Sequence, residues 1–487
     1  MVGCAVLRAA TLEGWKCCLL ESECHLLSHA SGSNSGIACT GVDATPGTLE
    51  RALIRDSNSM FRIYCKTHNV PTRPCGSLVC AWPWDDEAAG GEEEKKEERG
   101  SGSGSGSSSS EGENQKKEGS EENYENDNLN KVFDESYEAN DTHVRKLSSS
   151  QILQSLEPNL SPCLKGGVHI PGEIVVDPWL YSISLAIHAR ENGATIHTNS
   201  TFDSKQSHFD PLSNVWNVVF TQKKSVEGDG DSKGIERTIQ AKAVVNAAGL
   251  WSDTVQQQSG ASSNSKSNNH KQNSKMWTAK PRRGQYRIYS SNDKTAITHP
   301  IQPIPTQRTK GIFVFSSYYN QIVVGPTALD QESKTDRSID PIVAKELDLH
   351  VKRIIPSINT DADCIGEYVG VRPGTDKRDY QIHLYPKKNW VAVAGIRSTG
   401  LTASLGIGNY VVRNLHVILD DDDDEKSRLL HVSTTPLPPL DTLIENYQMR
   451  DDGCVTINGF EYKVTHPLTR LGWSAAKLHD SHAKSKL

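Results

Sequence analysis

Three short segments place glycines and small polar residues where an apolar strand is expected to end. They are residues 30–36 (ASGSNSG), 244–249 (VVNAAG) and 395–402 (GIRSTGLT). Loops of this kind let the backbone approach a phosphate or an aromatic ring and supply N–H donors to it. The last two lead into expected helices, whose N-terminal N–H groups stabilise negative charge. Plain turn chemistry is the alternative for each glycine taken alone.

The N-terminus carries the later parts of a dinucleotide-binding βαβ unit. After Met1-Val2-Gly3 comes a helix-like stretch, then Gly14, then an apolar strand at 17–20 that ends in Glu21. In such units the pyrophosphate lies at the helix N-terminus, and an acid about 20 residues after the glycines binds the ribose. Gly3 fits the third glycine of the fingerprint. The first strand and the first two glycines are missing, so we expect an incomplete N-terminus; an ordinary helix and strand, with Glu21 as a surface acid, is the alternative.

Composition limits the class of protein. The chain has 487 residues, room for two or more domains, but only 36% are hydrophobic and the mean hydropathy is -0.54. The net charge of -7 argues against a general nucleic-acid binder. No apolar run approaches the ~20 residues that span a bilayer, and no signal peptide is visible. The eleven cysteines are scattered without CxxC pairs, which favours a reducing, intracellular compartment and no metal site.

Much of the polarity lies in segments that interrupt the globular pattern. Residues 86–141 contain a charged run at 92–98 and a Gly/Ser repeat at 100–110, which predict a disordered low-complexity insert. A second polar insert, rich in Ser, Asn and Lys, is expected at 254–276. The acidic run 420–425 is interpreted as a solvated loop rather than a metal or partner site.

The remaining chain predicts a mixed α/β and α+β protein in two interleaved parts. We expect a Rossmann-like cofactor domain, with its first strand missing, from 1–85, 142–253 and 365–418, with segments of the substrate domain interleaved in these ranges. A mainly antiparallel substrate domain is expected at 277–364, and a C-terminal tail of uncertain role, with a short hairpin, at 419–487. Strands are expected at 17–20, 77–81, 215–220, 243–246, 311–315, 321–324 and 391–394. Helices are expected at 46–68, 178–192 and 402–412.

At these glycine-bearing segments the chain resembles the D-amino-acid-oxidase-type flavoenzyme superfamily. The resemblance is closest to the branch of FAD-dependent glycerol-3-phosphate dehydrogenases and L-2-hydroxyglutarate dehydrogenases. Matching stretches follow the order of that branch through residues 1–85 and about 150–415. Besides the three loops, they are residues 34–37, 43–53, 73–79, 281–286, 325–328 and 370–373.

The resemblance implies a bound FAD and assigns it contacts along the chain. Gly3 and Glu21 would contact the pyrophosphate and the ribose, and Asn34, Ser35 and Gly36 would lie near the flavin. Ala247, Ala248 and Gly249 would flank the dinucleotide. The pyrimidine edge of the flavin would be lined by Gly395, Gly400, Leu401 and Thr402.

The implied reaction needs an anchor for a small anionic substrate and a base for the proton of its alcohol. Arg372, in Gly-Val-Arg-Pro-Gly, is the best anchor because guanidinium binds carboxylate or phosphate in bidentate fashion; a surface salt bridge is its alternative. A histidine commonly follows the Asn-Ser-Gly-Ile sequence in this branch, but Cys39 stands there. We expect His299 as the substitute base, and Lys310 is the second candidate for this role.

The resemblance therefore implies an FAD-dependent oxidoreductase that transfers a hydride from a 2-hydroxy acid or glycerol 3-phosphate to flavin N5. Electrons would leave to a quinone, an electron-transfer flavoprotein or oxygen, in the cytoplasm or the mitochondrion. An amino-acid (amine) oxidase of the same superfamily is one alternative. The other is a truncated remnant without catalysis, because losing a central strand would leave backbone groups of the sheet unpaired.

Overall fold

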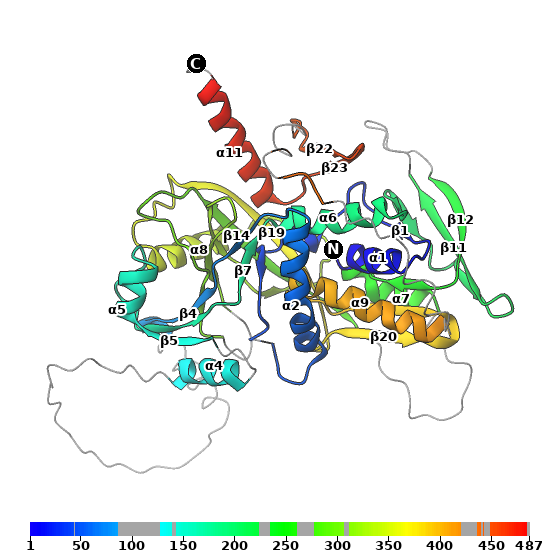
Figure 1. Ribbon diagram of the computed structural model, residues 1–487, viewed down its shortest axis with the longest axis horizontal. Coiled ribbons are helices and arrows are strands. Elements are labelled where there is room, and N and C mark those ends of the chain that lie inside the picture. The colour runs from blue at the N-terminus through cyan, green and yellow to red at the C-terminus, as the bar shows by residue number, and fades with distance from the viewer. Residues whose placement is uncertain are drawn as a thin grey trace, which may run out of the picture.

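The fold has two halves that meet near the N-terminus (Figure 1). Figure 1 shows α1 (Val2–Leu12), α6 (Pro178–Glu191) and α9 (Gly400–Leu419) grouped around the N-terminus, with the large sheet and α8 (Pro341–Ile354) beside them. The computed structural model describes residues 1–42, 44–85, 127–138, 143–223, 234–260, 277–305, 311–419, 436–439, 442 and 449–484.

The large sheet is mainly antiparallel, as expected for the substrate domain. Its strands follow the order β18-β14-β17-β16-β15-β4-β6-β5, with β19 on β14 and one parallel pair, β15 with β4. The consecutive strands β15, β16 and β17 form an antiparallel meander. The bounds are β4 Ser77–Ala81, β5 Arg145–Ser148, β6 Gly166–Ile170, β14 Ala279–Tyr289, β15 Ile301–Pro303, β16 Phe313–Ser316, β17 Ile322–Gly325, β18 Leu329–Asp330 and β19 Cys364–Thr375.

The other half contains short parallel strands in two separate groups. The strand β1 (Cys18–Leu20) pairs in parallel with β8 (Thr195–His197), and β13 (Val244–Asn246) pairs in parallel with β21 (Trp390–Ala394), which also pairs with β20 (Gln381–Tyr385). Within the described ranges, no strand is hydrogen-bonded between β1 and β13. Among the described residues, one edge of each of these two strands is therefore unpaired.

Small residues allow α9 to pack closely on two other helices. A Cβ at Gly408 would lie 2.8 Å from the carbonyl oxygen of Ala5 in α1, and one at Gly406 would lie 2.5 Å from that of Leu53 in α2 (Leu49–Thr67). Larger side chains there would force the helices apart. Thr48 caps α2, since its side chain accepts a hydrogen bond from the N–H of Arg51.

Smaller elements connect the two halves and cover them. They are η1 Ala30–Ser33, β2 Ile37–Ala38, β3 Thr72–Pro74, α4 Asp127–Glu138, α5 Ser149–Gln151, η2 Ile152–Leu156, β7 Ile174–Val176, β9 Ser200–Phe202, β10 His208–Asp210, β11 Val215–Gln222, β12 Ile235–Ala241, η3 Gly249–Trp251, α7 Ser252–Gln258, η4 Pro386–Lys388, β22 Cys454–Ile457, β23 Phe460–Lys463 and α11 Pro467–Lys484. The expected strands and helices are confirmed within a few residues, except that α9 runs seven residues beyond the predicted end at 412. Among the described helices, none combines the length and the apolarity that crossing a membrane requires.

The helix α4 corrects the expectation that residues 86–141 form one disordered insert. Leu129 and Val132 of α4 are buried against β4 and β6. Together with Phe133 they recur at spacings of three and four residues, which places them on one face of a helix. Residues 86–126 and 139–142 lie outside the described residues.

The polar insert at 254–276 begins later than expected, because α7 continues to Gln258. Gln256 is fully buried, and its Oε1 accepts a hydrogen bond from Trp390 Nε1 at 2.8 Å. The sequence around Gln256 is polar and therefore predicts exposure, because its burial partner Trp390 is distant in the sequence. Residues 261–276 lie outside the described residues.

The segments toward the C-terminal end pack against the rest of the fold. The strand β19 pairs with β14 along its whole length, so residues 365–375, at the start of the expected segment 365–418, belong to the large sheet. The expected hairpin is formed by β22 and β23, and α11 follows it, with Leu468 and Trp473 buried. The tail is therefore packed on the core where it is described. The acidic run 420–425 lies outside the described residues.

Candidate functional site

The first turn of α1 is the meeting point of four segments predicted to contact the cofactor. A Cβ added at Gly3 would lie 3.7 Å from the Cβ of Ala247, and one at Gly400 would lie 3.6 Å from Met1 Cε. The amino group of Met1 donates to Ser31 Oγ at 3.1 Å. The fold thus joins the fingerprint helix to the loops at 30–36, 244–249 and 395–402.

The geometry at this junction suits a dinucleotide. Gly249 has a φ of +56°, and no heavy atom lies within 4 Å of the position its Cβ would take, so the backbone is open to a ligand there. The N–H groups of the first turn of α1 have no partner within the helix. At the end of β1, the carboxylate of Glu21 accepts from the N–H of Glu23 at 3.0 Å. Ala248 lies exposed beside Gly249.

The loop 30–36 is held in one conformation by the side chain of Asn34. Its Nδ2 donates to the carbonyl of Ser31 at 2.8 Å, and its Oδ1 accepts from the N–H of Gly36 at 2.8 Å. Gly36 has a φ of +72°, which a residue with a side chain rarely adopts. Asn34 therefore shapes this loop through its own amide, and Ser35 is presented at its tip.

The start of α9 is anchored to the chain around Cys39. Thr402 Oγ1 accepts from the N–H of Cys39 at 3.0 Å and lies 3.5 Å from its Sγ. Leu401 and Thr402 are buried, and Gly395, with a φ of +71°, turns the chain out of β21. Cys39 is thereby fixed at the N-terminal end of α9, next to the predicted flavin edge.

The loop between β21 and α9 is also fixed from α2. The buried carboxylate of Glu50 accepts from Arg397 Nη2 at 2.5 Å and from Thr399 Oγ1 at 2.7 Å. Tyr380 OH lies 2.6 Å from the same threonine oxygen. This network was not predicted, because Glu50 lies within a helical pattern and nothing local marks it as a partner of a distant loop.

Arg372 lies on β19, on the face that carries the site. A Cβ at Gly284 would lie 2.6 Å from Arg372 Nη2, so glycine makes room for the guanidinium there. Nη2 donates to the carbonyl of Thr327 at 2.9 Å, and burial lowers the pKa of the guanidinium, opposed by the neighbouring Tyr286. Among the described residues, no carboxylate forms an ion pair with Arg372. A half-buried cation without a carboxylate partner among the described residues suits an anionic ligand.

Two tyrosines beside Arg372 were missed from the sequence. Tyr286 and Tyr368 stack with ring centroids 4.4 Å apart, and Tyr368 OH donates to the carbonyl of Asn34 at 3.2 Å. Between Tyr368 and Arg372 lies Gly370, where a Cβ would come 2.8 Å from the carbonyl oxygen of Ser33. Strand alternation places residues 368, 370 and 372 on one face, and this periodicity could have identified Tyr368.

His299 lies apart from Arg372. Its Nδ1 is 2.6 Å from Oε1 of the buried Glu157, which also accepts from the N–H of His299. The strand β15, which follows His299, is four strands from β19, about 19 Å at ordinary strand spacing. The structure therefore does not bring the predicted base to the predicted anchor. Lys310 lies outside the described residues.

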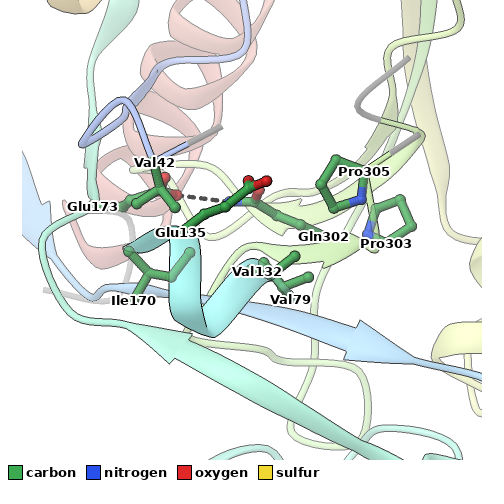
Figure 2. A pocket seen from close by; sticks show the side chains of 9 residues that line it. All are labelled: Val42, Val79, Val132, Glu135, Ile170, Glu173, Gln302, Pro303 and Pro305. Atoms are coloured by element: carbon green, nitrogen blue, oxygen red, sulfur yellow. Dashed lines mark hydrogen bonds between the residues drawn. The ribbon is translucent and has the colours of Figure 1, made fainter. Parts of the chain in front are cut away.

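A shallow pocket under α4 contains none of the predicted site residues (Figure 2). The buried carboxylate of Glu173 accepts from Gln302 Nε2 there at 2.7 Å. Figure 2 shows Val132 and Glu135 of α4 reaching toward this pair. The pocket is lined by Val42, Val79, Val132, Glu135, Ile170, Glu173, Gln302, Pro303 and Pro305. We do not assign the substrate to it.

The comparisons with known proteins identify the family. A family model described as "FAD dependent oxidoreductase" matches residues 1–414. The chain belongs to this family. FAD is the cofactor of the family, and the open backbone at Gly249, the first turn of α1 and the loop at 395–402 fit it.

Relatives of this FAD dependent oxidoreductase are glycerol 3-phosphate enzymes and hydroxyglutarate dehydrogenases. It is 26% identical over 414 residues, covering 85% of this chain and 71% of the relative, to a glycerol 3-phosphate dehydrogenase of Caloramator mitchellensis. It is 39% identical over 83 residues, covering 17% of this chain and 18% of the relative, to a mitochondrial L-2-hydroxyglutarate dehydrogenase of Nematostella vectensis. The structure of an L-alpha-glycerophosphate oxidase from Mycoplasma pneumoniae with FAD bound has the same fold, with a TM-score of 0.64 at 23% identity, covering 85% of this chain and 92% of that one.

The buried His466 of this oxidoreductase predicts a measurable loss of stability in acid. Burial lowers its pKa to about 3, whereas an unfolded histidine has a pKa of about 6.5. The unfolded chain therefore binds the proton first, so stability is intact above pH ~6.5 and falls as the pH drops toward 3, by about 1.4 kcal/mol per unit. His466 faces the Asn34 carbonyl, the Leu468 N–H and the ring of Tyr368, and none of these groups is charged.

Urea unfolding of wild type and His466→Gln across this pH range checks the prediction. The wild type should lose about 2 kcal/mol more than the variant between pH 6.5 and 5. Parallel pH curves for the two proteins would contradict the lowered pKa of His466.

Proposed function

We propose that this oxidoreductase oxidises a small anionic alcohol, glycerol 3-phosphate or a 2-hydroxy acid, whose anionic group is held by Arg372. The observation that carries the proposal is the half-buried guanidinium of Arg372, which has no carboxylate partner among the described residues. It lies on the same face of β19 as Gly370, which contacts the loop at 30–36. The glycerol 3-phosphate relatives, which match most of the chain, support an anionic alcohol as the substrate.

Each group of the site would have a separate task. Arg372 would orient the substrate through two parallel N–H donors, which fix its direction as well as its position. The stacked rings of Tyr286 and Tyr368 would exclude water beside the anion and strengthen its attraction to the guanidinium. When bound, FAD supplies the acceptor for the hydride of the substrate C–H bond. The proton of the alcohol needs an acceptor near Arg372, and the position of His299 does not favour it for this role.

Anaerobic mixing of the FAD-loaded chain with single substrates tests the proposal. Glycerol 3-phosphate or L-2-hydroxyglutarate should bleach the flavin absorbance bands, because the hydride reduces the ring. Glycine and sarcosine are the comparison for an amine oxidase. If an amino acid alone bleaches the flavin, the alcohol proposal is wrong and the amine oxidase alternative holds. Reoxidation with oxygen, a quinone or an electron-transfer flavoprotein then identifies the acceptor.

A chain without catalysis is the second possibility, which the edges of β1 and β13 favour, since one edge of each is unpaired among the described residues. Such edges expose backbone groups that ordinarily pair, and they promote aggregation. Purification of residues 1–487 followed by an absorbance scan separates the two cases. A soluble yellow protein supports the enzyme, whereas a colourless aggregate supports a chain without catalysis.

A further inference from the structure

The C-terminal segment 449–476, which lies beyond the part of the chain matched by the family, packs against the loop at 30–36. A Cβ at Gly32 would lie 3.1 Å from Thr465 Oγ1. The ring of His466 reaches the carbonyl oxygen of Asn34, with Nε2 at 3.0 Å. The segment therefore contacts a loop that the cofactor resemblance assigned to the flavin.

The segment is firmly attached at a buried carboxylate. Asp177, which caps α6, accepts from Thr469 Oγ1 at 3.0 Å and from the hydroxyl of Tyr319. Trp473 Nε1 in turn donates to the hydroxyl of Tyr319 at 2.8 Å. Since Asp177 is fully buried, these bonds tie the start of α11 to α6 without competition from water. His466, one residue before α11, is held in place by this attachment.

The hydrogen bonds of His466 define its tautomer. The N–H of Leu468 donates to Nδ1 at 3.3 Å, so Nδ1 carries no proton and Nε2 carries the N–H. That N–H donates to the carbonyl of Asn34, which also accepts from Tyr368 OH at 3.2 Å. Two buried donors from distant parts of the chain thus meet on one carbonyl oxygen.

We propose that His466 is a positioning residue for the cofactor: with Tyr368, it fixes the Asn34 carbonyl and so the orientation of the turn from Asn34 to Gly36 beside the flavin ring. The rotation of this peptide sets the Asn34 side chain, which in turn holds the N–H of Gly36. Loss of one donor leaves the turn free to shift against the flavin. The inference rests on FAD as the cofactor and does not depend on which alcohol is oxidised.

The test compares two replacements of His466 in the full chain loaded with FAD. His466→Gln keeps an N–H donor at nearly the same reach, whereas His466→Phe keeps the ring and removes the donor. We expect His466→Gln to retain the FAD affinity and the visible flavin spectrum of the wild type. His466→Phe should bind FAD about 10-fold more weakly, as loss of a hydrogen bond to a buried group implies, and should shift the flavin bands. His208 has an exposed side chain on β10, so His208→Phe is the matched control and should change neither quantity.

Tyr368→Phe is a second variant that tests the same proposal, and it replaces His466→Phe if that variant does not fold. It removes the second donor to the same oxygen, retains the stack on Tyr286, and should weaken FAD binding in the same direction. The proposal is overturned if both donor-free variants keep the wild-type spectrum and affinity, or if His466→Gln and His466→Phe lose flavin equally. Because the measurements use no substrate, failure of every alcohol to reduce the flavin would not affect them.

Discussion

Replacing Arg372 with alanine is expected to lower kcat/KM for the anionic substrate by about 100-fold or more while FAD stays bound. Truncating one partner of a buried, hydrogen-bonded charge pair costs about 2–5 kcal/mol, and 1.4 kcal/mol corresponds to a factor of ten. Arg372→Lys keeps the charge but loses the planar fork, so its loss should be intermediate. Steady-state kinetics of enzyme with a measured flavin content give both values.

Arg378→Ala is the matched control for this experiment. Arg378 is exposed just beyond the end of β19, so its removal changes the net charge equally without touching the site. If Arg378→Ala and Arg372→Ala lower kcat/KM to the same extent, the effect is one of overall charge, and Arg372 is not the anchor. An unchanged kcat/KM in Arg372→Ala would also show that Arg372 is not the anchor.

Replacing Trp390 with alanine is expected to destabilise the fold by about 3–5 kcal/mol, the usual cost of a large-to-small change in a core. Trp390 is fully buried in β21, with the ring of Trp216 at 5.0 Å and a hydrogen bond to Gln256. Its loss leaves a cavity beneath the strand that leads to Gly395. Thermal unfolding should show a Tm lower by about 3–5 °C, because the unfolding entropy of a chain of this length is about 1 kcal/mol/K.

Two further variants separate volume from hydrogen bonding at this position. Trp390→Phe retains most of the ring but not the N–H, and should lose about 1–3 kcal/mol because the buried hydrogen bond to Gln256 is removed. Trp84→Ala removes a partly buried tryptophan that stacks on Trp82, and should cost less than half as much as Trp390→Ala. Equal losses for the two alanine variants would show that burial of Trp390 is not the source of the effect.

The predicted glycine loops were recognisable because their requirements are local. A positive φ at Gly36, Gly249 and Gly395 depends on the residue itself, so the sequence alone marks where the chain must turn. The apolar runs of β4 and α6 likewise carry their own periodicity. These local signals, in their order along the chain, carry the family resemblance that implied the cofactor.

Pairings between distant residues could not be predicted in this way. Gln256 lies in a polar run, and only the fold brings Trp390 to it. His299 looked available as a base, yet its Nδ1 contacts the carboxylate of Glu157. The strand β15, which follows His299, also lies four strands from β19. No local pattern encodes which side chain lies opposite, because this depends on how whole sheets and helices pack.

The sequence by itself determined the family, through its resemblance at the glycine loops, and with the family the FAD cofactor. It also determined the element types and predicted Arg372 as the anchor for an anion. Residue types and their order along the chain are present before it folds. The tertiary structure alone decided that Arg372 lies over Gly284, and that His466 meets the Asn34 carbonyl 432 residues earlier in the chain. Such contacts depend on packing between distant segments, where a buried donor or cation gains its partner only after the intervening chain has folded.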